Sequence, residues 1–262
     1  MALHPLQSPL DRMIDYLGDA QRINEVIQQR LQQTTTARRA QGKPGGGQPG
    51  RPHSSLNRAV VVAAVGALEA FNEDLALTAQ PLDPQATPPS PWYEIDGRRG
   101  MVQTPSPYNL RKLYWTFFRY DPTPDWDLSV GVAPTELGTG SAWRVGTTSY
   151  KGIDASSFLD AMVKVRHGFA HQDKAQKPPA YAGIVTLTPT GRIAIHSHHA
   201  TNALSVLLQF AVLTTHGLAD WLSVTGRFRW SARMASANWE NLLCGTPAGS
   251  MVTKHWKNAP QL

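Results

Sequence analysis

Residues 54–80 read SSLNRAVVVAAVGALEAFNEDLALTAQ, and this stretch decides the class of fold. Ser54 or Ser55 can cap a helix there, because a serine hydroxyl accepts hydrogen bonds from the unpaired backbone N–H groups of a first turn. The stretch is too long for a β-strand, and its run of small apolar residues suits a helix that is covered on most sides. It therefore predicts a long buried helix.

Other segments on both sides of this stretch also show helical patterns. They are residues 8–31, 106–120, 153–172 and 200–224. Two β-branched runs within residues 181–198 are separated by a Thr-Pro-Thr-Gly turn, which predicts a β-hairpin. The predicted fold class is therefore all-α: an up-and-down helical bundle with one small β-hairpin.

The chain divides into four parts by composition. Residues 1–40 supply the N-terminal helix of the bundle, and Ser8 with the following proline predicts its start. Residues 41–53 hold five glycines and three prolines, so they predict a flexible loop. Residues 54–226 form the helical core with the hairpin, and residues 227–262 form a basic C-terminal extension. Residues 121–150 carry turn signals and predict no regular element.

Charge and cysteine content indicate the class of partner and the compartment. The net charge is +6 and the pI is about 9.6, which favours polyanions, above all nucleic acid, as partners. A single cysteine excludes an intrachain disulfide and suits a reducing compartment. We expect no signal peptide and no membrane span, because the apolar runs are short. The expectation is a soluble cytoplasmic protein.

The stretch VKVRHGFAHQD, residues 163–173, places an arginine and two histidines at the end of an apolar helix. His167 and His171 are four residues apart and leave the same helix face. Arg166 and His171 are five residues apart, which is about 140° around an ideal helix. These two side chains converge only if the helix ends near His171.

Three interpretations of this stretch compete. In the first, Arg166 and His171 interact with the negative end of the helix dipole. In the second, His167 and His171 bind zinc together with a histidine from near residues 196–199, although Gly168 stands where zinc proteases carry a catalytic glutamate. In the third, a histidine transfers a proton and the arginine binds two phosphate oxygens, which is acid–base chemistry on a phosphodiester.

The spacing from Arg166 to His171, with the polar His167 after the arginine, resembles the Arg-x4–6-His signature of the HEPN superfamily. Residues 56–75 resemble the family's earlier long helix, in which an acidic residue follows small apolar ones. The order of the segments is similar to that of the RiboL-PSP-like subgroup, which is linked to RNA repair. The resemblance covers roughly residues 54–225, and the loop and the basic extension have no counterpart in it.

This resemblance implies an all-helical protein that dimerises with its Arg/His helices facing each other. Family members are often metal-independent endoribonucleases of toxin–antitoxin pairs, antiviral defence or RNA processing. By that analogy His171 is the general base or acid, Arg166 stabilises the charged phosphorane and His167 assists. The products are a 2′,3′-cyclic phosphate and a 5′-hydroxyl end, with no metal and no cofactor expected. The alternative is a non-catalytic RNA- or protein-binding dimer with a vestigial motif.

The expected partners are RNA, an antitoxin protein and a second copy of the chain. The predicted helix carries more apolar positions than one buried face requires, and an exposed remainder is typical of an interface. These positions are Phe158, Leu159, Met162, Val163, Val165 and Phe169. The hypothesis is therefore a homodimer that uses residues 158–172.

Several other residues have both a functional and a structural interpretation. The resemblance suggests that Glu69 orients Arg166 or a histidine, whereas the simpler interpretation is a solvated helix face shared with Asn72 and Glu73. The histidines at 196, 198 and 199 could contact RNA or bind a metal, and the favoured interpretation is a polar strand end. In the basic extension, Arg227, Arg229 and Trp230 alternate charged and aromatic side chains around Phe228. That pattern suits RNA binding, or simply rings that pack onto the bundle.

Overall fold

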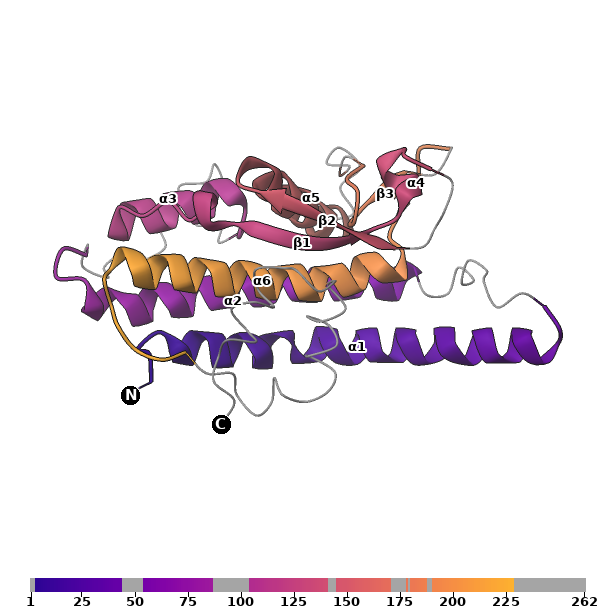
Figure 1. The fold of residues 1–262 in the computed structure, drawn as a ribbon, viewed down its shortest axis with the longest axis horizontal. Helices are drawn as coiled ribbons and strands as arrows, with labels where there is room; N and C mark the ends of the chain where they lie inside the picture. The colour runs from indigo at the N-terminus through magenta and orange to yellow at the C-terminus, as the bar shows by residue number, and fades with distance from the viewer. Residues whose placement is uncertain are drawn as a thin grey trace.

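The computed structural model describes residues 3–43, 54–86, 104–140, 145–170, 178, 180–187 and 190–228. Three long helices lie side by side, and a second layer of shorter elements covers two of them (Figure 1). The long helices are α1 (Gln7–Ala40), α2 (Ser54–Ala79) and α6 (Ser197–Trp221). Helices α2 and α6 run parallel, and α1 runs antiparallel to both. The mostly helical fold class is therefore confirmed.

The second layer contains two helices and a two-stranded sheet. Helix α3 (Pro107–Phe118) leads through a 3₁₀ turn (Thr123–Asp125) into β1 (Asp127–Val132). Strand β1 pairs antiparallel with β2 (Gly146–Lys151), and the short helix α4 (Pro134–Leu137) lies in their connection. Helix α5 (Ile153–Ala170) follows β2 and packs on α2. A 3₁₀ turn (Gln80–Leu82) ends α2.

The sequence analysis missed the β1–β2 sheet, because only β1, DLSVGV, alternates polar or small residues with Leu and Val, whereas its partner β2, GTTSYK, carries a single large apolar residue. Side chains of α6 satisfy the backbone of β1. The Ser129 N–H donates to Gln209 Oε1 at 2.8 Å, and Gln209 Nε2 donates to the Ser129 carbonyl at 3.0 Å. Both groups are buried, so this pairing replaces a neighbouring strand. The short helix α4 follows β1 and contacts the start of α6 through Glu136.

The predicted hairpin is present but short. Strand β3 (Thr186–Leu187) pairs antiparallel with β4 (Ile193–Ala194), inside the predicted range of residues 181–198. The prediction that the following histidines lie at a strand end is wrong. His196 is the N-cap of α6, and His198 and His199 lie in its first turn.

The predicted helices are otherwise close to the observed ones. Ser106 caps α3 by accepting a hydrogen bond from the Asn109 N–H at 3.3 Å. Helix α1 differs, because Leu6 is its N-cap and no side chain caps it, so Ser8 does not have the predicted role. The loop at 41–53 lies outside the described residues from position 44 onward, and so does the basic extension from position 229.

The apolar surplus that motivated the dimer interface on α5 is absent. Five of its six apolar side chains are buried within the chain itself: Phe158, Leu159, Met162, Val163 and Val165. Only Phe169 is exposed, at 40%. The physical reason is that α2 packs on one side of α5 while the β-sheet layer covers another, so the helix is buried on more than one face. That argument for a dimer is therefore wrong.

Helix α6 is long and apolar enough to cross a membrane by length and composition. However, 89% of its most apolar window is buried inside the molecule, as in the core helix of a soluble protein. It contacts α1, α2 and β1.

Candidate functional sites on α5 and at the start of α6

An ion pair joins α5 to α2 near the middle of the molecule. Arg166 Nη1 lies 2.8 Å from Glu69 Oε2, and the two side chains are 26% and 25% exposed. Burial raises the pKa of Glu69, and the neighbouring guanidinium of Arg166 opposes that rise. The contact between Glu69 and Arg166 that the resemblance suggested is therefore present.

The alternative interpretation of Glu69, a solvated helix face, fails at Asn72, although Glu69 itself remains 25% exposed. Asn72, which was expected to share that face, is 3% exposed. The hydroxyl of Tyr114 donates to Asn72 Oδ1 at 2.7 Å, and Asn72 Nδ2 donates to the Leu68 carbonyl. This part of α2 is covered by α3 and α5, so Glu69 lies at the border of the core.

His167 lies beside Arg166 on α5 and contacts the segment before α3. Its Nε2 is 3.3 Å from Thr104 Oγ1. The described part of α5 ends at Ala170, and His171 lies outside the described residues. The structure therefore brings together two of the four predicted catalytic residues, Arg166 and Glu69, with His167 adjacent in sequence.

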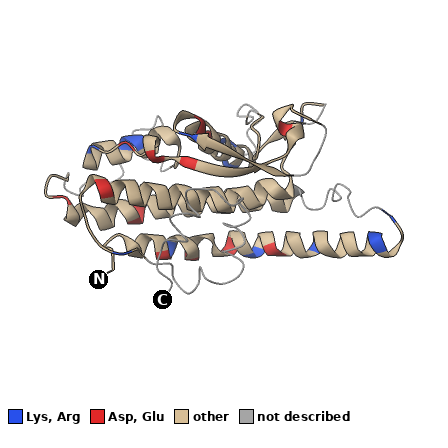
Figure 2. Ribbon diagram, viewed as in Figure 1, with Lys and Arg blue, Asp and Glu red and all other residues tan. Residues whose placement is uncertain are grey.

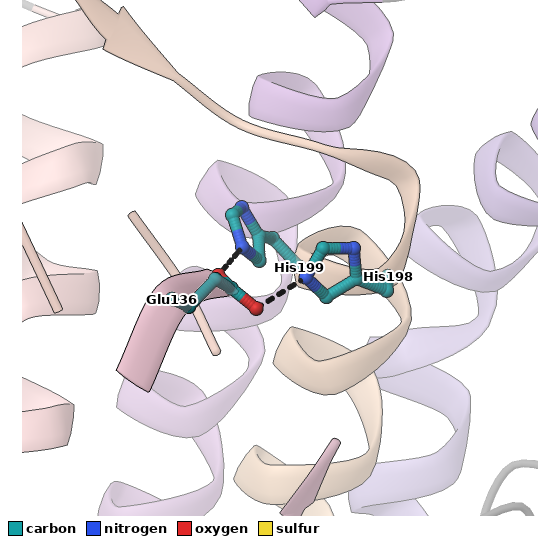
Figure 3. A group of neighbouring side chains, drawn as sticks. All are labelled: Glu136, His198 and His199. Atoms are coloured by element: carbon teal, nitrogen blue, oxygen red, sulfur yellow. Dashed lines mark hydrogen bonds and ion pairs between the residues drawn. The ribbon is translucent and has the colours of Figure 1, made fainter. Parts of the chain in front are cut away.

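A second cluster, not predicted from the sequence, lies where α4 meets the first turn of α6 (Figure 3). One oxygen of Glu136 lies 2.9 Å from His198 Nε2, and the other lies 2.5 Å from His199 Nε2. The same carboxylate accepts the backbone N–H groups of Ala133 at 2.9 Å and Gly183 at 3.3 Å. Its side chain is 1% exposed, so four hydrogen bonds compensate for the burial of its charge.

The protonation of this cluster follows from its contacts. Burial acts to raise the pKa of Glu136, but hydrogen bonds from His198 and His199 outweigh it and hold that pKa well below the ordinary value. Burial lowers the pKa of His199 to about 4, although Glu136 opposes the change. Burial also lowers the pKa of His196, whose Nε2 lies 2.9 Å from Thr186 Oγ1.

Glu136, His198 and His199 also offer potential metal ligands, with ligand atoms within 4.8 Å of one another. Two histidines and a carboxylate are a zinc-type set. However, the His196 N–H donates to His199 Nδ1 at 3.0 Å, so Nδ1 is unprotonated and Nε2 carries the proton. Coordination through Nε2 would move that proton to Nδ1, where two N–H donors would face each other. The contacts therefore fit a hydrogen-bonded cluster better than a metal site.

The sequence pointed to the histidines of this cluster but not to its carboxylate. The three histidines at 196, 198 and 199 were visible, but Glu136 lies about 60 residues earlier in a segment with no predicted element. The Pro-Thr-Glu sequence after Ala133 was the available clue. A proline at the first helical position and a glutamate at the third are typical of a helix N-terminus.

The candidate RNA-binding residues lie at the edge of the described part. Arg227 forms a backbone bridge with Leu3 at the start of the chain. Phe228 stacks on His4, with ring centroids 3.9 Å apart, and also contacts His216. Phe228 therefore packs onto the bundle, while Arg229 and Trp230 lie outside the described residues.

The chain matches no protein-family model, no curated protein and no solved structure.

Proposed function

We propose that this protein is a metal-independent endoribonuclease related to the HEPN superfamily. The observation that carries the proposal is the 2.8 Å ion pair between Arg166 and Glu69, with His167 next along α5. The carboxylate of Glu69 orients the guanidinium of Arg166. Because 26% of the arginine side chain remains exposed, the guanidinium is still accessible to an anion. The Arg-x4-His spacing and the basic charge of the chain support the same function.

The proposed reaction is an intramolecular transfer within RNA. The 2′-hydroxyl oxygen attacks the adjacent phosphorus while a base, His171, takes its proton. The bond from phosphorus to the 5′ oxygen breaks, and that oxygen takes a proton from an acid. Arg166 stabilises the negative charge on the phosphorane oxygens. The products are a 2′,3′-cyclic phosphate and a 5′-hydroxyl end.

The site is proposed to be completed by a second copy of the chain. On an ideal helix Arg166 and His171 point about 140° apart, so one helix does not direct both at one phosphate. A two-fold axis near the end of α5 would bring Arg166 of one protomer beside His171 of the partner subunit. Phe169 lies between these positions in sequence and is 40% exposed.

The test is cleavage of total RNA by the purified protein in the presence of EDTA, with the new ends identified chemically. We expect 2′,3′-cyclic phosphate ends from the wild type and at least a 100-fold lower rate from Arg166→Ala and from His171→Ala. Arg111→Ala is the matched control, because Arg111 is an exposed arginine of α3 that is also paired with a carboxylate, that of Asp121.

Cleavage that requires a divalent metal would contradict the proposed mechanism. Binding of intact RNA that Arg166→Ala does not affect would favour the non-catalytic alternative. Expression in a bacterial host provides a second test. The wild type is expected to slow growth and His171→Ala to restore it, and an antitoxin protein would be recovered as a suppressor of that toxicity.

A further inference from the structure

The second half of α1 extends beyond the rest of the bundle (Figure 1). Helix α1 has 34 residues, whereas α2 has 26 and α6 has 25. Its last fully buried residue is Ile27, and Leu31 is its last side chain packed against the core. Among the described residues, the hydrogen bond from Gln28 to Thr201 at 3.3 Å is the last side-chain hydrogen bond from α1 to α6. Residues 29–43 are called the arm below.

The charged residues of the arm are all basic. The arm contains Arg30, Arg38, Arg39 and Lys43 and no acidic residue. Figure 2 shows the basic residues toward the end of α1, where no acidic residue is drawn. Within the described part of the chain, none of the three arginines forms an ion pair, and Arg38 Nε is buried without a hydrogen-bond partner.

Six cations on the bundle differ from those of the arm, because each has an acidic neighbour. The pairs within the described residues are Arg12–Asp74, Arg22–Asp19, Arg111–Asp121, Lys151–Asp127, Lys164–Asp160 and Arg166–Glu69. Six cations of the bundle are therefore neutralised by an acidic neighbour, whereas within the described residues the three arginines of the arm have no such neighbour.

Interaction with the dipole of α1 can explain only some of the basic residues of the arm. Arg38 and Arg39 lie in the last turn of α1, where a cation stabilises the helix dipole by about 0.3–1 kcal/mol. Arg30 lies more than two turns earlier and gains nothing from the dipole. The arm also contains three consecutive threonines, which are poor helix formers, and a helix of about 12 residues without packing is marginal in water.

We infer that the arm binds the phosphate backbone of RNA. Arginine pairs with two phosphate oxygens at once, and Arg30 and Arg38 lie about 12 Å apart along the axis and about 80° apart around it. Two such side chains can contact separate phosphates of one strand. Naming RNA as the polyanion rests on the proposed function, whereas the binding of a polyphosphate backbone rests on the unpaired arginines.

The experiment compares two triple variants of the full chain that carry the same net charge. The first is Arg30→Gln/Arg38→Gln/Arg39→Gln. The control is Arg22→Gln/Arg111→Gln/Lys151→Gln, which removes three exposed cations that have acidic partners. The probe is a fluorescein-labelled 2′-O-methyl RNA, which the 2′-hydroxyl reaction cannot cleave. Anisotropy gives Kd as a function of KCl concentration, and circular dichroism checks that both variants stay folded.

The arm variant is expected to bind the probe at least tenfold more weakly in low KCl. Its slope of log Kd against log[KCl] should fall by about 2, since each neutralised phosphate of a single strand contributes about 0.7. The control should stay within about twofold of the wild type, because its cations are already neutralised. Equal affinity and slope in the arm variant and the control would overturn the inference.

The outcome is independent of catalysis. If the wild type cleaves RNA but the arm variant binds the probe normally, the arm inference fails and the proposed function stands. If no cleavage occurs but the arm variant loses the probe, the proposed function fails and the arm inference stands. Loss of self-association in the arm variant with unchanged RNA affinity would show that the arm binds protein instead, and would overturn the inference.

Discussion

Arg166 and Glu69 form an ion pair that lies at the border of the core, with each side chain about one-quarter exposed. A fully exposed pair would exchange its contacts with water and would not fix the guanidinium. A fully buried pair would be inaccessible to a substrate. The position between these limits is suited to holding an arginine while one side of it remains open. The pair also connects the two helices that the HEPN resemblance identified.

The first prediction is that Glu69→Gln lowers RNA cleavage, because Arg166 loses its orientation, while the free energy of unfolding changes little. The amide fills the same space but loses the charge that holds Arg166. We expect RNA cleavage to fall about 10–100-fold, because the guanidinium is no longer fixed against the phosphate. Since burial already raises the pKa of Glu69, loss of its charge should change the free energy of unfolding by no more than about 1 kcal/mol.

The matched control for that experiment is Glu73→Gln, one turn further along α2. Within the described residues Glu73 forms no ion pair with Arg166, whose partner is Glu69, so its removal should leave cleavage within about twofold of the wild type. Equal losses from both variants would show that the negative charge of the helix, rather than the contact with Arg166, is what matters.

The second prediction concerns pH. Because the folded pKa of His199 is about 4, below its ordinary value of 6.5, the unfolded chain binds a proton between these pH values that the folded chain does not. The unfolding free energy must therefore fall as the pH falls through this window, by up to about 1.4 kcal/mol per pH unit. The charged or titratable groups around His199 are Glu136, His196 and His198.

Urea unfolding at pH 7 and pH 5 tests this expectation. The wild type should lose stability on acidification, and His199→Gln should lose clearly less because the titrating ring is absent. His196, whose pKa burial also lowers, contributes in the same direction and remains in the variant. An identical pH dependence in both proteins would show that His199 does not titrate as described.

The third prediction is that zinc does not bind at Glu136, His198 and His199. The His196 N–H donates to His199 Nδ1, so the proton that would have to leave Nε2 has no favourable place on the ring. Adding Zn²⁺ should not raise the melting temperature, and EDTA should not lower it. Calorimetric titration that shows one tight zinc site, lost in His198→Ala, would contradict this assignment of protons.

Much of the fold was predictable from the sequence because its helices carry local signals. Length, apolar periodicity and caps such as Ser106 depend on neighbouring residues, so α2, α3 and α5 were placed within a few residues. The β1–β2 sheet was missed because its stability is not local. Ser129 on β1 is paired by Gln209 of α6, which lies 80 positions later in the sequence.

The two candidate sites differ in the same way. The pairing of Arg166 with Glu69 was one of the interpretations left open for Glu69, and it came from a resemblance, which supplied the long-range relation that spacing alone does not contain. Glu136 had no such guide. Its role depends on α4 lying over the first turn of α6, and the histidines there were interpreted as a strand end because the hairpin before them was taken to be longer.

The fourth prediction concerns Gly183, which joins the Glu136 cluster to the core. Its φ is +90°, and an added Cβ would lie 2.6 Å from a methyl group of Val130 and 3.3 Å from the ring of Phe158. Gly183→Ala should therefore lower the unfolding free energy by about 2–4 kcal/mol, through backbone strain and overpacking. Gly138→Ala is the control, because its φ is also positive but no atom lies within 4 Å, so only strain of about 1 kcal/mol remains. Equal losses, measured by urea unfolding, would show that packing at Gly183 is unimportant.

The fifth prediction is that the protein is a homodimer whose interface includes Phe169. Apart from Ile153 at the far end of α5, the other large apolar residues of this helix are buried in their own chain, so the interface is expected to be small and centred on this ring. Light scattering should give a dimer for the wild type and a monomer for Phe169→Glu, since a charge buried in an interface is costly. Ile153→Glu is the control, because Ile153 is 79% exposed at the opposite end of the same helix.

A mixing experiment then tests whether each site is shared between chains. Arg166→Ala and His171→Ala subunits are each expected to be inactive. After exchange, half of the dimers contain one subunit of each kind, and one of the two sites in such a dimer has both residues intact. Cleavage should therefore recover to about a quarter of the wild-type rate. No recovery, with exchange of subunits demonstrated, would show that Arg166 and His171 act within one chain. A fully active monomer would exclude the shared site altogether.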